Sequence, residues 1–364
     1  MDLKWTSLLF LVAITSDTVF SAPTSSVTTN DTASDCRLFQ QYINKRYPLT
    51  DPILMPDGSV KFRIAIISDL DADSTSHSKS NTWISYFKQG SLTYNAQNKT
   101  VSVEWDIAVD NNDQLQSDMS KNGRGLELSE LVTFDGRLIT LDDKTGLVYV
   151  FENNVLIPWV IVVEGDGHQK GAMKNEWATV KDSKLYVGSH GKEMPDRNGQ
   201  LSEKSYASMW VKTIDQYGSV KHLNWTENFV KVRAAVGIQY PGYMTHEACV
   251  WSDVHGRWFF LPRKASAEQY EYKADENKGT NVLLMATPDF NDVTVKRIGE
   301  IIPNRGYASF KFVPGTNDTV IAAINTTEEG DITATYLSVF TIDGEIIYPQ
   351  NKVSDMKFEG FEFI

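Results

Sequence analysis

The stretch SELVTFDGRLITLDD, residues 129–143, contains a strand, a tight turn and a second strand. Apolar side chains fill both halves, and the Asp135-Gly136 pair between them is typical of a hairpin turn. Similar hairpins open later in the chain, each with a compact or acidic residue in first place: Glu176, Glu247 and Ala308. A fifth copy opens at Glu359, and the chain stops after its first strand. The sequence therefore repeats one β-hairpin unit.

The β-hairpins are separated by turns and loops, and they recur roughly every fifty to seventy residues. This spacing is typical of a β-propeller with loops of unequal length. Five units predict five blades. The lone last strand needs a partner, and the run KFRIAIISDLD at 61–71 has the length and composition of a buried strand. We therefore predict an all-β fold, a five-bladed β-propeller whose last blade is closed by an N-terminal strand, which leaves no open sheet edge.

The chain has 364 residues and a formal net charge of -12. Repeats that run to the last residue favour one propeller domain over two smaller domains, and we place it at residues 59–364. Lysine and arginine are scattered rather than clustered, so a nucleic acid polymer is not an expected partner. An acidic protein that handles anions needs a cation to mediate.

The first 22 residues have the features of a cleaved secretory signal: a basic residue near the start, an apolar run over 8–14, and small residues at Ser21 and Ala22. Residues 23–58 are rich in Ser, Thr, Asp and Pro, and we interpret them as an N-terminal arm. No other stretch has the length of a membrane span. We expect a secreted (extracellular) monomer without a membrane anchor.

Glycosylation sequons and cysteines accompany this predicted signal. The sequons are Asn30, Asn98, Asn224, Asn317 and Asn325. The sequence does not decide which of them carries a glycan. Two cysteines, Cys36 and Cys249, are too few for a disulfide framework. Because Cys249 falls inside an expected inner strand, a buried thiol is the ordinary outcome, and a bridge to Cys36 is the alternative.

Propeller geometry predicts which residues meet. The innermost strand of each blade lines the central channel and the next strand returns antiparallel, so the start of the first and the end of the second lie on one face. The five repeat openings then surround the axis: Ser129, Glu176, Glu247, Ala308 and Glu359. A second ring is expected just outside them: Asp69, Asp71, Asp143, His190, Arg263 and Thr326.

Three carboxylates that converge without matching basic residues must be protonated or hold a cation. Oxygen donors suit Ca²⁺ better than zinc or iron, and the six histidines show no zinc-ligand spacing. We therefore predict a calcium site at the channel mouth. The run DLDAD at 69–73 looks like the start of an EF-hand loop, but Ser74 and Ser80 stand where that loop needs Gly and Glu.

The stretch GRGLE at 123–127 is a candidate phosphate contact. Its two glycines let the backbone approach a ligand, and the guanidinium of Arg124 could grip phosphate. Trp177, directly after Glu176, is a candidate nucleotide contact, although a tryptophan in such a repeat is more often a packing residue. The turn DDKTG at 142–146 is, by spacing alone, an ordinary hairpin connection.

Several motifs in fixed order carry a family resemblance. They are GRGLELSEL (123–131), KNEWATVKD (174–182), GYMTHEACVWSD (242–253), RWFFLPRKAS (257–266), GYASFKFVP (306–314) and the terminal KFEGFEFI. From the sixties to its end, the chain resembles the calcium-activated nucleotidases, whose salivary members are the Cimex-type apyrases. The resemblance implies one Ca²⁺ at the mouth of a five-bladed propeller, held at Ser129, Glu176, Glu247, the position of Ala308, and Glu359.

The chain departs from this family at two positions. Ala308 stands where serine is expected, so its side chain cannot be a ligand, and its main-chain carbonyl or Ser309 are the alternatives. Met194 stands where a tryptophan is expected beside the base. The resemblance also implies catalytic or nucleotide-binding roles for further charged residues: Asp69, Asp71, Glu127, Asp143 and Arg263.

The implied activity is hydrolysis of ATP and ADP to AMP and phosphate. In saliva this would inhibit platelet activation, because ADP would be removed. Ca²⁺ would hold the phosphate chain, Asp69 or Asp71 would activate water, and arginines such as Arg124 would stabilise the transferred phosphoryl group. Two alternatives are a Ca²⁺-dependent propeller hydrolase of another class, a lactonase or phosphotriesterase, and a non-enzymatic Ca²⁺-binding propeller.

Overall fold

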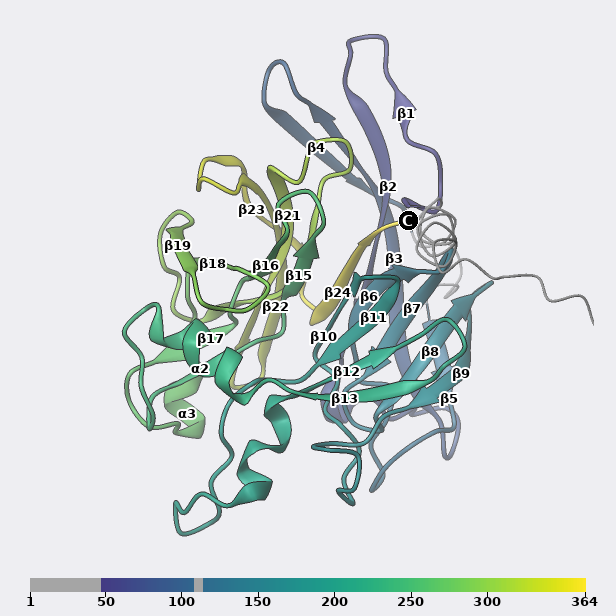
Figure 1. Ribbon diagram of the computed structural model, residues 1–364. Helices are drawn as coiled ribbons and strands as arrows, with labels where there is room; N and C mark the ends of the chain where they lie inside the picture. The colour runs from purple at the N-terminus through teal and green to yellow at the C-terminus, as the bar shows by residue number, and fades with distance from the viewer. Residues whose placement is uncertain (1–46, 108–113) are drawn as a thin grey trace, which may run out of the picture. The chain divides into compact units, whose positions relative to one another are not determined.

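The computed structural model describes residues 47–107 and 114–364. The predicted signal sequence, Asn30 and Cys36 lie outside these residues. Within them the predicted five-bladed propeller is confirmed, since five antiparallel sheets follow one another in a ring (Figure 1). Cys249 is a buried thiol in an inner strand, as expected.

Four blades are meanders of four strands each. The first is β6 (Leu128–Phe134), β7 (Arg137–Asp142), β8 (Leu147–Glu152) and β9 (Val155–Ile161), and the second is β10 (Trp177–Lys181), β11 (Lys184–Gly188), β12 (Trp210–Ile214) and β13 (Val220–Asn224). The third is β15 (Cys249–Ser252), β16 (Arg257–Phe260), β18 (Val282–Ala286) and β19 (Val293–Arg297), and the fourth is β20 (Arg305–Phe312), β21 (Val320–Glu329), β22 (Ile332–Thr341) and β23 (Ile346–Ser354).

The closing blade joins the two ends of the described chain. Its order is β24 (Phe358–Phe363), β2 (Val60–Ser68), β3 (Trp83–Asn95) and β4 (Thr100–Trp105), with β5 (Gln114–Ser117) on β3 and β1 (Ile53–Leu54) on β2. Ile64 pairs with Phe363 and Ile66 with Phe361, and Figure 1 shows the yellow β24 beside the purple β2. The predicted closure is therefore confirmed. The short strand β1 shows that part of the expected arm belongs to this sheet.

The remaining elements lie in the loops. They are a two-stranded sheet of β14 (Tyr243–Thr245) and β17 (Lys264–Ser266), the helices α2 (Thr226–Ala234) and α3 (Tyr272–Asp275), and two 3-10 turns, η1 (Asp71–Ser74) and η2 (Glu203–Met209). Most of them belong to the second and third blades. The sequence analysis did not predict them, because short elements in long loops have no clear periodicity.

The core is divided into five apolar clusters, one between each pair of neighbouring blades in the described residues. Strand β2 shows how one strand serves two clusters. Ile64 and Ile66 face the fourth blade, whereas Ala65 and Ile67 face the first. Because alternate side chains point to opposite faces and both faces are covered, the strand is apolar throughout.

Three inner strands carry a β-bulge at the same place. The pairing of β6 with β7 skips Ser129, the pairing of β20 with β21 skips Ala308, and the pairing of β24 with β2 skips Glu359. A bulge leaves one residue outside the ladder and turns the strand locally. All three bulges fall on positions that the sequence placed around the axis.

The closure generates a prediction. Phe361 is fully buried between β2 and the fourth blade, so Phe361→Ala should lower the free energy of unfolding by about 3–5 kcal/mol. Urea unfolding followed by tryptophan fluorescence measures this loss. Ile157→Ala, at an exposed position of β9, is the control and should change it by less than about 0.5 kcal/mol. Equal effects of the two substitutions would mean that β24 does not close the ring.

Candidate active site

A cavity of about 250 Å³ lies where the inner strands begin. Its lining is densely charged, with eight carboxylates and five lysine or arginine side chains besides His190. The carboxylates are Asp69, Asp71, Glu176, Glu247, Asp275, Glu276, Glu328 and Glu359, and the cations are Lys174, Lys192, Arg263, Lys264 and Lys357. Three residues of the predicted inner ring, Glu176, Glu247 and Glu359, and two of the outer ring, Asp69 and Arg263, line it and are buried with charged partners, as the following contacts show.

Glu176 and Glu247 come from the second and third blades and share one partner. His190, just after β11, places its Nε2 atom 3.0 Å from Glu176 Oε1 and 3.4 Å from Glu247 Oε1. Burial raises the pKa of Glu176, but His190 and Lys174 outweigh it, so this pKa is lowered overall. Burial alone would lower the pKa of His190. The neighbouring Glu176 carboxylate more than reverses this effect, so the pKa of His190 is raised overall. Each group therefore stabilises the charged form of the other.

Arg263 links the third blade to the chain terminus. Its guanidinium donates to Glu247 and, at 2.5 Å, to Glu359 Oε1, and its other nitrogen lies 2.9 Å from Glu328 Oε2. Burial raises the pKa of Glu359 well above its ordinary value, against the effects of Lys357 and Arg263. Burial and the nearby Asp69 and Glu247 carboxylates therefore disfavour the charged form of Glu359, and an added cation would stabilise it.

Lys174 and Lys357 occupy equivalent places in two blades. Lys174 donates to Asp143 and Glu176. Lys357 donates to Asp71, and its Nζ lies 3.1 Å from Asp69 Oδ2 and 3.8 Å from Glu359 Oε1. Each lysine stands two residues before an axial glutamate, so both side chains reach the same face.

These contacts correct one premise of the sequence analysis. The axial carboxylates do have matching basic residues. Lys174 and Lys357 precede β10 and β24, His190 and Arg263 follow β11 and β16, and all four lie among the carboxylates. The sequence held a signal for the lysines, the repeated pattern Lys-x-Glu at 174–176 and 357–359. No comparable signal marks Glu328, which reaches the site from the far end of β21.

Arg124 and the aspartates form the second part of the site. Arg124 binds Glu127 in a two-pronged pair of 2.7 and 2.5 Å, and its Nη2 lies 3.2 Å from Asp71 Oδ1. Asp71 has a φ of 48°, a left-handed conformation that aspartate tolerates better than most residues, and its backbone N–H donates to Asp69 at 2.8 Å. Asp69 is buried, whereas Asp71 is 45% exposed.

The donors present fit a hard cation. One oxygen or nitrogen atom from each of Glu176, His190 and Glu247 lies within 4.8 Å of the others, and the same holds for Asp69, Asp71 and Glu127. Ser129 Oγ and Asp143 Oδ1 are buried without a hydrogen-bond partner. Buried polar atoms are rarely left unpaired, so orphaned oxygens beside clustered carboxylates are consistent with a bound ion.

Ala308 behaves as a packing residue through its side chain. Its methyl group is fully buried in the apolar cluster that also contains Phe361. The alternative ligand, Ser309, donates instead to Glu130 Oε1 at 2.7 Å in the interior. Of the two alternatives, only the main-chain carbonyl of Ala308 remains open.

Trp177 lies away from the cavity. Its indole is fully buried in the cluster between the second and third blades, and its Nε1 donates to the carbonyl of Ser189 at 3.1 Å. The ring covers Gly188, its partner across the β10–β11 ladder, where a Cβ atom would come within 1.9 Å of the indole. This burial corrects the expected nucleotide contact, because no face of the ring is open to a base.

Met194 lies at a smaller pocket beside the charged cavity. This pocket measures about 160 Å³ and includes Tyr240, Tyr243 and Tyr270, and it shares Lys192 and Tyr270 with the cavity. Lys192 Nζ lies 3.7 Å from the ring centre of Tyr270, and burial lowers the pKa of this lysine to about 8. Aromatic side chains are therefore close to the charged cavity even though Trp177 is not.

The fold and the site define a class of protein: a five-bladed propeller whose channel mouth combines clustered carboxylates with lysine and arginine side chains. The profile of the family described as Apyrase matches residues 70–364, and the chain belongs to this family. It is 45% identical to mouse soluble calcium-activated nucleotidase 1 over 335 residues, which cover 91% of this chain and 81% of that protein. It is 42% identical to an apyrase of Cimex lectularius, over 88% and 87% of the two chains, and 36% identical to an apyrase of Phlebotomus duboscqi, over 84% and 89%. The protein is accordingly a nucleoside phosphate hydrolase, and its substrates are nucleotides.

The Arg263 contacts generate a prediction. Arg263→Met leaves Glu247 and Glu359 buried without their shared partner, so the free energy of unfolding in chelator should fall by about 3–5 kcal/mol. The matched control is Arg257→Met in the same hairpin, whose exposed pair with Asp292 is worth at most about 1 kcal/mol. Urea unfolding of both variants in EGTA gives the comparison. Similar losses would show that the Arg263 pairs are not coupled to the core.

Proposed function

We propose that the protein is a secreted, Ca²⁺-dependent apyrase that hydrolyses ATP and ADP to AMP and phosphate, and that it limits platelet aggregation during blood feeding. The observation that carries the proposal is the excess of carboxylates over lysines and arginines in a cavity that belongs to a nucleotide hydrolase. A polyphosphate would be repelled from such a cavity unless a cation accompanied it.

Calcium suits this cavity because its acidic donors are oxygens. The residues that would hold it are Glu176, Glu247 and Glu359, with Ser129 and the carbonyl of Ala308; Ser129, Ala308 and Glu359 each stand at a bulge. When bound, Ca²⁺ would supply the positive charge that neutralises the phosphate chain and orients it. The printed name of the mouse relative, calcium-activated nucleotidase, supports this choice of metal.

The chain's own cations would bind the transferred group. Arg263 and Lys357 line the cavity and already pair with carboxylate oxygens, which are anionic hydrogen-bond acceptors like the oxygens of a phosphate. Arg124 presents its guanidinium to Asp71 from the other side. In phosphoryl transfer such groups stabilise charge on the equatorial oxygens.

Asp71 is the residue that we assign to water activation. It lines the cavity and is half exposed, whereas Asp69 and Asp143 are buried and hold Asp71 and Lys174 in place. Water attacks the terminal phosphorus, its proton passes to the Asp71 carboxylate, and the bond to the bridging oxygen breaks. The shortened nucleotide leaves with that electron pair.

Export is supported by the N-terminal signal predicted from the sequence. In the described residues no helix has the length and apolar character that a membrane crossing requires. The two insect relatives carry apyrase in their names, which supports the nucleotide chemistry proposed for this chain.

The test is phosphate release from ADP and ATP by the purified chain in Ca²⁺, in Mg²⁺ and in EGTA. We expect release from both nucleotides in Ca²⁺ and at least a tenfold loss in EGTA, because the cavity then repels the phosphates. The same preparations are assayed for hydrolysis of a lactone and of a phosphotriester. Turnover of either, without phosphate release from ADP, would overturn the proposal and favour another class of propeller hydrolase.

Two variants should distinguish the loss of Ca²⁺ binding from the loss of catalysis. Glu176→Gln should weaken Ca²⁺ binding and lower activity together, since it removes an expected ligand. Asp71→Asn should leave Ca²⁺ binding within about twofold and lower kcat by roughly 10²–10⁴-fold, the range for loss of a general base. Isothermal titration with Ca²⁺ and steady-state kinetics measure the two effects. Full activity of Asp71→Asn would remove this residue from the mechanism.

A further inference from the structure

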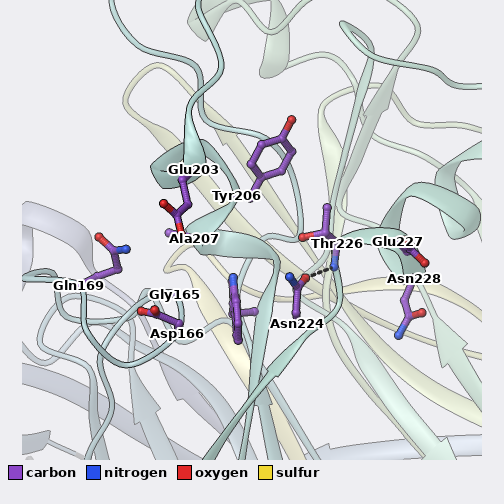
Figure 2. Close-up of a pocket in the computed structure, with 11 residues that line it drawn as sticks. Gly165, Asp166, Gln169, Glu203, Tyr206, Ala207, Asn224, Thr226, Glu227 and Asn228 are labelled. Carbon is purple, nitrogen blue, oxygen red and sulfur yellow. Dashed lines mark hydrogen bonds between the residues drawn. The ribbon is translucent and has the colours of Figure 1, made fainter.

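A second cavity, of about 510 Å³, lies on the second blade and shares no lining residue with the active-site cavity. Figure 2 shows side chains from the η2 turn, from the loop that contains Asp166, and from the end of β13 facing one space. Its volume is in the range of about 300–1,000 Å³ that is usual for small-molecule sites. The proposed nucleotidase function gives this cavity no role.

Residues of one predicted sequon line this cavity. Asn224, the last residue of β13, is exposed and lines it together with Thr226, the third residue of the same sequon. The other sequons in the described residues lie elsewhere. Asn98 and Asn317 are exposed in hairpin turns, and Asn325 is buried in β21.

The side chain of Asn224 is oriented by its own sequon. The backbone N–H of Thr226 donates to Asn224 Oδ1 at 2.9 Å. Because only the amide oxygen can accept this bond, the nitrogen Nδ2 faces the other way, as Figure 2 shows. Nδ2 is the atom that an N-linked sugar would bond to.

The lining suits a neutral sugar. Trp210 is the direct cross-strand partner of Asn224, so the indole lies on the same face of the sheet, and Tyr206 adds a second partly exposed ring. Aromatic faces accept the C–H groups of a pyranose, and the nearby Asp166, Gln169 and Glu203 can bind its hydroxyl and acetamido groups. Carboxylates without a basic residue in the lining disfavour an anion such as a nucleotide.

We propose that Asn224 carries an N-linked glycan and that its first N-acetylglucosamine lies in this cavity against Trp210 and Tyr206. The bond forms between Asn224 Nδ2 and the anomeric carbon of a lipid-linked oligosaccharide. The bond from that carbon to the lipid pyrophosphate breaks, Nδ2 loses one proton, and the pyrophosphate leaves with the electron pair. The inference rests on the secretory route proposed above, which supplies this co-reactant.

The experiment uses the full chain secreted from insect cells. Glycopeptide mass spectrometry measures occupancy at each site, and native PNGase F digestion over time measures release, since the enzyme converts Asn to Asp. We expect glycan at Asn224, no glycan at Asn325, and release from Asn224 at least tenfold slower than release from Asn98. The protein surface around Asn98 is an open turn, so this site is the internal control.

Trp210→Ala should raise the release rate at Asn224 to within about twofold of Asn98 and leave Asn98 unchanged. Tyr206→Ala is the second variant, and phosphate release from ADP verifies that each variant is folded. Glycan at Asn98 with a bare Asn224 would overturn the inference while the secretory route stands. Equal release rates in the unsubstituted chain would overturn the placement in the cavity, and an unmodified chain retained in the cell would overturn the secretory route itself.

Discussion

Negative charge that converges on one axis is the constraint on which the rest of this structure depends. The propeller brings Glu176, Glu247 and Glu359 to a single channel mouth, where they are buried. Such a cluster can stay ionised only if opposite charge is brought to the same place. Lys174, His190 and Arg263 supply part of it, and a bound cation is proposed to supply the remainder.

The same requirement explains why the blades are tied together by ion pairs. His190 bridges carboxylates of the second and third blades, and Arg263 joins the third blade to β24. Apolar clusters between neighbouring blades stabilise the packing of the blades, while these ion pairs position the side chains at the channel mouth. A site assembled from separate blades is therefore sensitive to closure of the ring, and β24 contributes both Phe361 to the core and Glu359 to the site.

The propeller and most of the site could be predicted because alternation along a strand is a local property. Repeat openings mark positions that must meet when strands radiate from one axis, and β2 was recognisable as the missing strand by its continuous apolar run. Trp177 was misassigned because its sequence position cannot show which way the indole turns. Gly188, across the ladder, provides the space that the ring fills, and only pairing reveals that neighbour.

By itself, the sequence determined the repeat, the fold class, the closing strand and the residue types at the channel mouth, since each depends on period and spacing. Tertiary structure alone decided which charges compensate one another. Lys357 reaches Asp69 and Asp71 across almost the whole length of the chain, and Ser309 turns inward to Glu130 while the bulge at Ala308 leaves its methyl group in the core. The physical reason is that electrostatic and packing energies depend on distances in space, which separation along the chain does not fix.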